Sequence, residues 1–594
     1  MGYLNKYVIK YWKLFLSAII FLSLEAACDL IQPTIMAKIV DVGVKNKDLD
    51  YVFKLSMSMI LITGIGAIGA TIRNIISGKV SQQFGADLRI DLFKKINSLS
   101  FEQLNSLDGS SLITRLTNDV TQMQNFFNRL MRIFVKAPIL CIGSLIIAFK
   151  LNYRLAFIFI IIIPIVVLLI VFNMRISYPF YLKMQSALDK VNGIIREYLS
   201  GVRVVKAFNR FDYEEERFKY ENENLSNISK KALRVNAFFS PTIGLIVNMG
   251  IVLVIWLGGI GVNNGTIYTG EIIAFINYMT KILFSLMMIS NVFMTFIKAK
   301  ASTERIGEIF NVGDSKEQIN IDIRYKRNNI LKEQTEINNN KGINNLQGNI
   351  SFNDVSFSYS DETNENVLSN ITFSCKSGEK LGIIGSTGAG KTTLMNLLCG
   401  FYKINSGSIK IDDIDINEID KRELRNSIGI IPQKVLLFSG TILDNIRWGK
   451  EDASLEEVKE VCKIAQIHEL IESLPEKYDT LLGQGGVNLS GGQKQRISIA
   501  RALIRRPKIL IMDDCTSALD GKTEHKIKEE LGKFSENLTC IIITQRISSV
   551  KDSNKILVIE DGSIIGSGTH NELKNNCSVY RDIIKSQLGE DEIS

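Results

Sequence analysis

The chain has 594 residues, 46% of them hydrophobic, and a formal net charge of +8. This composition predicts long apolar segments, and so modest a charge does not indicate nucleic-acid binding. The eight cysteines include no CxxC pair, so the sequence predicts neither a disulfide framework nor a zinc site.

Six apolar segments in the first half of the chain are predicted to cross a membrane. Residues 155–172 form the purest of them, because eighteen uncharged residues approach the roughly 20 that span ~30 Å of hydrocarbon. The first segment is too long for the apolar core of a signal peptide, so we expect it to remain as a span. The other five segments are 14–37, 52–76, 133–149, 241–262 and 272–297.

The distribution of Lys and Arg predicts the orientation of these spans. Residues 79–132 carry seven basic side chains and residues 173–240 carry twelve, whereas the three opposite loops together carry five. The positive-inside rule therefore places both long segments, both termini and the second half of the chain in the cytoplasm. We expect a multi-pass protein of the lipid bilayer of a cell membrane.

Both long cytoplasmic segments are predicted to be helical continuations of the spans. Residues 80–104 keep apolar side chains at helical spacing among charged ones. Asn118 and its neighbours, and the segment 201–208, are expected near the tips of these extensions. Residues 3–12 are short and amphipathic, and two interpretations stay open: an interfacial helix, or a plain solvated start to the first span.

Two carboxylates, Glu25 and Asp29, stand four residues apart inside the first span and therefore share one helix face. Charged side chains at such a depth are costly and usually face a cavity or a partner. One hypothesis makes them a site for a cationic substrate. The other makes them polar contacts between helices, with Lys281 as a partner.

The chain is predicted to divide into three parts. Residues 1–310 form the membrane α-helical domain, and residues 311–349 form a polar tether, rich in Asn and Lys, that lacks the apolar side chains of a core. From residue 350 on, apolar strands alternate with helices, which predicts an α/β domain over residues 350–594.

A nucleotide-binding motif stands near the start of this α/β domain. An apolar strand leads into Gly385-x4-Gly390-Lys391-Thr392 and an apolar helix follows, which is the strand–loop–helix context of a P-loop. The glycines let main-chain N–H groups converge on phosphate, Lys391 reaches the β- and γ-phosphates, and Thr392 binds Mg²⁺. ATP and Mg²⁺ are therefore the predicted cofactors.

A second buried strand, 509–513, ends in the carboxylate of Asp513, which is typical of a Walker-B aspartate that holds Mg²⁺. Between the two motifs the sequence reads Leu489-Ser-Gly-Gly-Gln493. With this signature the chain resembles the ATP-binding-cassette (ABC) transporters, specifically their exporter-type half-transporters. The resemblance covers nearly the whole chain. It implies the ABC exporter fold, a membrane domain of six transmembrane helices followed by an α/β P-loop nucleotide-binding domain, and an ATP-driven translocase activity.

The resemblance also assigns roles to single residues. Tyr359 matches the aromatic side chain that stacks on adenine, Gln433 matches the Q-loop glutamine that senses Mg²⁺ and water, and Ser517–Asp520 matches the D-loop. Two cassettes of this family pair head to tail, so the signature would serve the ATP of the partner chain. Cys515 beside the Walker-B strand is interpreted as a small buried side chain. The implied ligands are Tyr359, Gly385, Ser386, Thr387, Gly388, Ala389, Gly390, Lys391, Thr392, Thr393 and Gln433 for ATP, Thr392, Gln433 and Asp513 for the metal, and Ser490, Gly491, Gly492 and Gln493 in trans.

Two positions depart from the family pattern, and both concern hydrolysis. The residue after the Walker-B aspartate is Asp514, where the family normally has a glutamate that polarises the attacking water. The aspartate side chain reaches about 1 Å less far than glutamate, and such a misplacement can cost ~100-fold in rate. The switch histidine is replaced by Gln545, which can bond a γ-phosphate but cannot carry the positive charge or shuttle the proton. The predicted catalytic set, Asp514, Gln545 and Gln433, therefore belongs to a site that binds ATP better than it hydrolyses it.

An intact signature beside a weakened site favours pairing with a different half-transporter that has the consensus glutamate and histidine, as in the bacterial heterodimeric multidrug exporters that the chain resembles. The leading hypothesis is ATP-driven export of a small molecule, a drug or a lipid, by that heterodimer. Two alternatives stay open: a regulatory subunit gated by ATP occupancy, and a homodimeric exporter. The motifs name neither the substrate nor the direction of transport.

Overall fold

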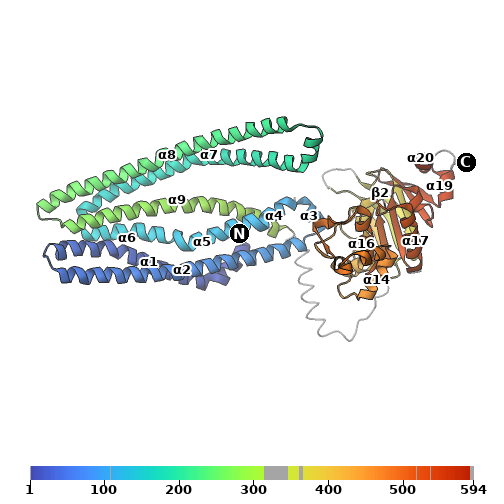
Figure 1. Ribbon diagram of the computed structural model, residues 1–594, viewed down its shortest axis with the longest axis horizontal. Helices are drawn as coiled ribbons and strands as arrows, with labels where there is room; N and C mark the ends of the chain where they lie inside the picture. The colour runs from blue at the N-terminus through green and yellow to red at the C-terminus, as the bar shows by residue number, and fades with distance from the viewer. Residues whose placement is uncertain are drawn as a thin grey trace. The chain divides into compact units, whose positions relative to one another are not determined.

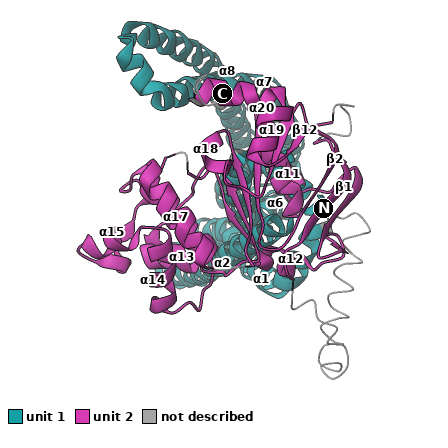
Figure 2. Ribbon diagram, turned by 90° about the vertical axis from the view of Figure 1, so that its right-hand side faces the viewer, with its two compact units in different colours: residues 1–99, 103–319 teal, residues 100–102, 320–594 magenta. Residues whose placement is uncertain are grey.

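The computed structural model describes residues 2–107, 109–312, 346–359, 366–516, 518–534 and 537–588. Contacts divide the chain into two compact units, residues 1–99 with 103–319 and residues 100–102 with 320–594 (Figure 2). Most of the predicted linker 311–349 lies outside the described residues, as does Ser517 of the predicted D-loop. The predicted domain boundaries stay predictions.

Unit 1 consists of long helices that run side by side (Figure 1). Among the described residues, six helices are long and apolar enough to cross a membrane, which confirms the predicted number of spans. Side-chain caps fix where two of them begin, because Asp48 Oδ1 accepts from the Tyr51 N–H at 3.0 Å and Asn152 Oδ1 accepts from the Arg154 N–H at 3.1 Å. The elements, where η denotes a π-helical turn in unit 1, are α1 (Gly2–Lys38), η1 (Ile39–Val44), α2 (Leu49–Ser98), α3 (Phe101–Ser106), α4 (Gly109–Thr114), η2 (Arg115–Asp119), α5 (Val120–Arg129), η3 (Leu130–Phe134), α6 (Lys136–Leu151), α7 (Tyr153–Ala207), α8 (Phe211–Asn263) and α9 (Thr269–Asn311).

The first helix shows no break between residues 3–12 and the apolar segment that follows. Tyr7 and Tyr11 are buried, and their hydroxyls donate to Asp91 at 2.7 Å and to Asp87 at 2.6 Å on α2. These contacts hold the first turns of α1 against α2. Residues 3–12 are therefore the start of the first span, but one face of them packs on α2 and is not solvated as the second interpretation expected.

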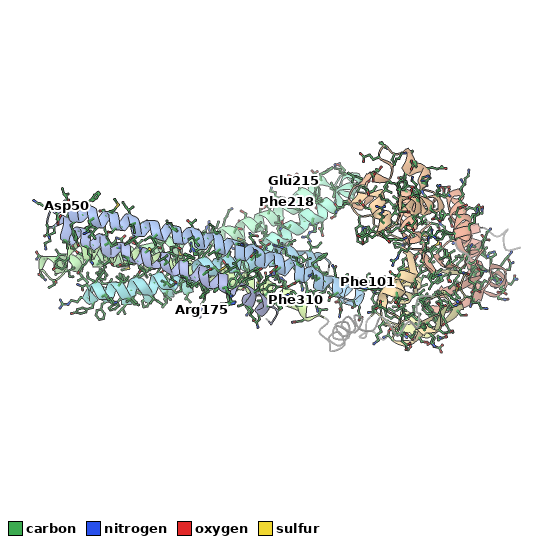
Figure 3. The ribbon with its side chains drawn as sticks, turned by 90° about the horizontal axis from the view of Figure 1, so that it is seen from below. Asp50, Phe101, Arg175, Glu215, Phe218 and Phe310 are labelled. Carbon is green, nitrogen blue, oxygen red and sulfur yellow. The ribbon has the colours of Figure 1, made fainter. Side chains whose placement is uncertain are left out.

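Three helices extend beyond their apolar segments, as predicted. α2 continues to Ser98, and α7 and α8 form a hairpin that turns directly after the expected tip 201–208. Figure 3 shows Glu215 and Phe218 near this turn and Asp50 at the opposite end of the helices. The expectation for Asn118 was wrong, because extended backbone at Leu99 already ends α2 and Asn118 follows later, in η2. Its neighbour Asp119 is buried against Arg305 of α9, whereas Asn118 itself is exposed.

Unit 2 is an α/β domain with mixed sheets, as predicted. Its six-stranded sheet has the order β12-β11-β3-β10-β9-β6 and is parallel except for the edge strand β12. An antiparallel sheet has the order β2-β1-β4-β5, and β7 pairs with β8. The strands are β1 (Ile350–Phe357), β2 (Leu368–Cys375), β3 (Lys380–Gly385), β4 (Ser406–Ile411), β5 (Ile414–Asp415), β6 (Ile428–Ile431), β7 (Gly440–Thr441), β8 (Leu481–Leu482), β9 (Ile509–Asp513), β10 (Thr539–Thr544), β11 (Lys555–Glu560) and β12 (Ser563–Gly568).

Both faces of the six-stranded sheet are covered, because parallel strands carry apolar side chains on both sides. Ile511 and Ile541 pack in a core with Leu394 of α11, whereas Leu510 and Met512 pack in a second core with side chains of α14, α16 and α17. Figure 2 shows α14, α15 and α17 on one side of the strands and α11 on the other. The helices and 3-10 turns are α11 (Lys391–Leu398), α12 (Lys421–Ser427), α13 (Ile442–Arg447), α14 (Leu455–Ile464), α15 (His468–Ser473), η4 (Lys477–Asp479), η5 (Gln484–Gly486), α16 (Gly491–Leu503), α17 (Gly521–Phe534), α18 (Ile547–Val550), α19 (His570–Asn576) and α20 (Ser578–Leu588).

Candidate nucleotide-binding site

The P-loop, the Walker-B strand and the switch position meet at the carboxyl edge of the six-stranded sheet. β10 lies between β3 and β9, and its register pairs Thr544 with Ile384 and Ile543 with Asp513. The three adjacent parallel strands β3, β10 and β9 therefore end at nearly the same level along the strand direction. This edge is where open α/β sheets bind their ligands.

Two glycines let the P-loop backbone adopt dihedral angles that other residues disfavour. Gly388 has φ +87° and Gly390 has φ +94°, both in the left-handed region that favours glycine. A Cβ on Gly390 would also lie 2.6 Å from Leu368 Cδ2, so the loop could not approach β2 as closely. The loop ends at Lys391, where α11 begins, so its N–H groups gather at a helix N-terminus. This cradle fits phosphate oxygens.

The basic and acidic groups of the loop lie close together. Lys391 Nζ donates to the carbonyl oxygens of Gly385 at 2.9 Å and Ser386 at 2.5 Å, and Thr392 Oγ1 donates to Asp513 Oδ2 at 3.2 Å. Burial raises the pKa of Asp513 above its ordinary value and lowers the pKa of Lys391 below its ordinary value. A hydroxyl beside a carboxylate supplies the oxygen donors that Mg²⁺ prefers, so these side chains fit the ion.

A cavity of about 220 Å³ opens over this edge and brings together most of the predicted residues. It includes the whole predicted catalytic set, although Gln433 comes from the segment after β6. Gly385, Ser386 and Ala389 belong to the loop but do not line the cavity. The lining consists of Val367, Thr387, Gly388, Gly390, Lys391, Thr392, Thr393, Gln433, Asp513, Asp514, Ile543, Thr544 and Gln545.

Asp514 is held between two neutral donors at the cavity wall. Its Oδ2 accepts from Gln433 Nε2 and its Oδ1 from Thr544 Oγ1, both at 3.4 Å. Its own N–H donates to the Ile543 carbonyl at 2.7 Å, and its φ of 42° lies in the left-handed region, which aspartate tolerates better than most residues. The carboxylate is therefore in the cavity, at the start of the loop that follows β9.

Gln545 also lines this cavity. Its Nε2 donates to Thr387 Oγ1 of the P-loop at 3.2 Å, so the switch position and the P-loop are in direct contact. Its main-chain carbonyl accepts from Gln587 Nε2 at 2.6 Å, and Gln587 Oε1 accepts from the Ile547 N–H at 3.0 Å. Helix α20 thus holds the backbone of the switch loop through two hydrogen bonds of Gln587.

Sequence reasoning missed several of these residues. Ile543 and Thr544 directly precede the switch position, and that adjacency was the signal that could have identified them. Val367 and Gln587 belong to no motif, and only the tertiary fold brings them to the site.

Tyr359 stands beside the P-loop helix rather than in the lining of the cavity. Its hydroxyl lies 3.0 Å from Thr393 Oγ1, and its ring packs edge-on against Phe357 and Tyr402. The side chain is 48% exposed, so the ring retains an accessible surface. An exposed ring next to a P-loop fits the stacking of a base.

The signature forms the N-terminus of α16. Ser490 Oγ accepts from the Gln493 N–H at 3.3 Å and Gln493 Oε1 accepts from the Ser490 N–H at 2.8 Å, which is a capping box. A Cβ on Gly492 would lie 2.9 Å from the Ala518 carbonyl oxygen, so glycine lets this helix pack on the D-loop. None of the signature residues lines the cavity described above, and Ser490 and Gly491 are exposed.

Cys515 is buried, as expected for a small packing side chain, with 2% of its surface exposed. Burial raises the pKa of its thiol to about 12, so the reactive thiolate is not populated at neutral pH.

Glu25 and Asp29 form polar contacts between helices of unit 1. Lys136 Nζ lies 2.5 Å from Glu25 Oε1 and 2.9 Å from Asp29 Oδ2, and Arg73 Nη1 lies 3.2 Å from Glu25 Oε2. Lys281 contacts the main-chain carbonyl of Asp29 instead of a carboxylate. The contacts favour the structural hypothesis, with Lys136 and Arg73 as partners in place of Lys281.

Comparison with known proteins agrees with this geometry. A family model described as the ABC transporter transmembrane region matches residues 15–287, and one described as the ABC transporter matches residues 368–517. An uncharacterised ABC transporter ATP-binding protein, YfiB of Bacillus subtilis, is 40% identical over 96% of this chain and 96% of its own length. The ATP-dependent lipid A-core flippase of Desulfotalea psychrophila is 36% identical over 84% of each chain.

A solved structure resembles the whole chain. It is described as a bacterial Atm1-family ABC exporter with ATP bound, and it matches with a TM-score of 0.77 and 25% identity over 99% of each chain. The P-loop edge, the six apolar helices and these matches lead to one conclusion. The chain belongs to the ABC transporters, as an exporter-type half-transporter in which a membrane domain is fused to an ATP-binding ATPase domain.

Proposed function

We propose that this chain is the half of a heterodimeric bacterial exporter whose own site binds ATP with Mg²⁺ but hydrolyses ATP slowly. The observation that carries the proposal is the pair Asp514 and Gln545, which line the P-loop cavity where the family has glutamate and histidine. The residues that would hold phosphate are unchanged. In this proposal the cassette and both termini lie in the cytoplasm, and the membrane domain exports a small molecule or a lipid.

The binding roles follow from the chemistry of the side chains. The N–H groups of loop 385–390 and the ammonium of Lys391 hold the phosphates, and Tyr359 stacks on the base. Thr392 and Asp513 hold Mg²⁺, with Gln433 contacting the ion or its water. When bound, the ion neutralises charge on the transferring phosphoryl group.

Slow hydrolysis follows from reach and charge. The Asp514 carboxylate is hydrogen-bonded to Gln433 and Thr544, and a glutamate there would extend one methylene further. A misplacement of about 1 Å at a reacting group can cost ~100-fold in rate. Gln545 donates through a neutral amide, so it holds the switch loop to the P-loop without supplying a transferable proton.

The signature supports an unlike partner. Ser490 and Gly491 are exposed and absent from the lining of this chain's own cavity, as expected of residues that serve another chain's ATP. ABC exporters act as dimers, and a homodimer of this chain would have two weak sites. A partner with glutamate and histidine would instead form one efficient site with this intact signature.

The test is the ATPase rate of the chain alone and with its cognate half in proteoliposomes. We expect the pair to be active and the chain alone to be slow. In the pair, Asp514→Asn retains most turnover, whereas replacing the partner's catalytic glutamate abolishes it. The double variant Asp514→Glu, Gln545→His raises the rate of the chain alone by ~100-fold, and the matched change Asp452→Glu, at an exposed loop position, does not.

The other outcomes identify the alternatives. High activity of the chain alone, unchanged by the partner, would establish a homodimeric exporter. Transport that follows ATP occupancy without hydrolysis at either site would establish a regulatory subunit. Equal loss of turnover from Asp514→Asn and from the partner variant would refute the assignment of roles.

A further inference from the structure

The apolar spans of unit 1 contain a connected group of five ionisable side chains, which we call the intramembrane charge cluster. Its members come from four helices that are apolar enough to cross the membrane: α1, α2, α9 and the helix that includes α6. It has two carboxylates and three cations. The members are Glu25, Asp29, Arg73, Lys136 and Lys281.

Both carboxylates of the cluster are already neutralised. Glu25 is 8% exposed and lies between Lys136 at 2.5 Å and Arg73 at 3.2 Å, while Asp29 lies 2.9 Å from Lys136. A carboxylate flanked in this way offers no free charge to a cationic ligand. Two cations and two anions therefore balance within the cluster.

Lys281 is the cation left over. Its ammonium donates to the main-chain carbonyl of Asp29, and within the described part of the chain no carboxylate lies within 4.0 Å of it. Lys281 is half-buried and lies in the apolar segment Thr269–Ile289 of α9. A charge at such a position is costly, and because the cluster holds one cation more than it holds anions, we expect a ligand of opposite sign at this position.

The surroundings of Lys281 indicate what else the ligand carries. Phe284 and Met288 follow at i+3 and i+7, which places them on the same face of α9. Phe284 is 57% exposed and Met288 is 37% exposed. An accessible aromatic ring and an adaptable thioether on the helix face that carries one ammonium suit a molecule with an anionic head and an apolar body.

We propose that the exported substrate is an anionic amphiphile and that Lys281 binds its anionic group, with Phe284 and Met288 contacting its apolar part. This inference rests on the proposed function as an exporter and replaces the hypothesis of a cationic substrate. A carboxylate or a phosphate would satisfy Lys281 equally well. The substrate is therefore an acidic lipid or a soluble organic acid with a long apolar chain.

The test uses the full chain with its cognate half in nanodiscs and two probes with one fluorescent body. Dansylaminoundecanoate ends in a carboxylate, and its analogue ends in trimethylammonium. We expect the carboxylate probe to bind about tenfold tighter or more, because hydrogen bonds to charged groups are the stronger ones. Fluorescent phosphatidylglycerol and phosphatidylcholine, followed across proteoliposome bilayers, then separate a lipid from a soluble acid.

Three substitutions and one control tie the preference to the cluster. Lys281→Gln removes the preference for the carboxylate probe and leaves the trimethylammonium probe unchanged, and Lys281→Arg keeps the preference. Lys298→Gln, an exposed lysine on the same helix, is the matched control and has no effect. Glu25→Gln retains or strengthens anion binding, because it leaves Lys136 and Arg73 less compensated.

Equal binding of the two probes, or an unchanged preference in Lys281→Gln, would overturn the inference. So would a Lys281→Gln variant that only loosens the dimer, since a carboxylate of the partner chain would then be the missing counter-ion. The ATPase rate of the same nanodiscs without probe reports on the exporter proposal separately. If that rate shows the expected asymmetry while the probes bind equally, only the substrate inference fails.

Discussion

The hydrogen bonds between Gln587 and the switch loop lead to a specific prediction for Gln587→Ala. The side chain bridges the Gln545 carbonyl and the Ile547 N–H, at 2.6 and 3.0 Å. The helix that carries it, α20, is anchored separately by Tyr580 and Ile584, which are buried in a core with Val550 and other side chains. The substitution therefore removes the bridge and leaves the anchor in place.

The size of the effect follows from the two lost bonds. Each neutral hydrogen bond contributes about 0.5–1.5 kcal/mol net, and the exposure of Gln587 places both toward the lower end. A combined loss of about 1–2 kcal/mol corresponds to a factor of roughly 5–30 in an equilibrium constant. We expect ATP affinity to fall by that factor, because Gln545 contacts Thr387 of the P-loop. Because the same two bonds stabilise the folded domain without ATP, the midpoint of thermal unfolding should fall by only a few degrees.

The assay is ATP binding to the full chain, by displacement of a fluorescent ATP analogue, beside a thermal melt of the same sample. Gln587→Glu keeps the acceptor for Ile547 but places a carboxylate oxygen against the Gln545 carbonyl, so its affinity should fall at least as far as that of Gln587→Ala. Ser586→Ala, one residue earlier on α20, is the control, since Ser586 donates only to the Ile583 carbonyl of its own helix. Wild-type ATP affinity in Gln587→Ala, or a loss that merely follows a much larger fall in the unfolding temperature, would refute the reasoning.

Three further predictions concern the signature, the metal ligand and the helix packing of unit 1. Gly492→Ala places a Cβ 2.9 Å from the Ala518 carbonyl and should abolish turnover of the pair, whereas Gly532→Ala on α17, with no atom within 4 Å of the added Cβ, should be mild; equal rates would contradict this. Burial raises the pKa of Asp513, so its carboxylate should become protonated at a higher pH than an ordinary aspartate does. Acidification should therefore weaken ATP binding in Mg²⁺ but not in EDTA, as measured by titrations across pH. Asp119→Asn weakens a buried carboxylate's contacts to Ser302 and Arg305, and should lower the free energy of unfolding by about 1–3 kcal/mol, checked by chemical denaturation in detergent.

The sequence predicted the parts of this protein that contiguous residues encode. The P-loop needs a strand, glycines and Lys391 in one short stretch, and all of these are adjacent in the chain. Apolar segments likewise identify spans without reference to their neighbours, and the six helices agree with them. Asp514 and Gln545 could be placed because each directly follows a strand that the motifs already located.

Contacts between distant segments could not be predicted in the same way. Lys281 was expected to pair with the carboxylates of the first span, but Lys136 and Arg73 do so, because the rotation of each packed helix decides which face meets α1. Gln587 reaches the switch loop from α20 with no motif to mark it. Asn118 was expected near a tip because the position at which α2 ends was not apparent from periodicity alone.

The placement of Asp514 and Gln545 also bears on how such transporters diverge. Each is the first residue after a strand, at positions where side chains project into a cavity and not into the apolar cores. Their identities are therefore free of the packing constraints that hold the sheet together. After a gene duplication, one copy could lose its hydrolytic residues in single steps while its fold and its signature helix stayed intact. Selection on such a pair would act on the division of labour between the two copies rather than on the survival of either one.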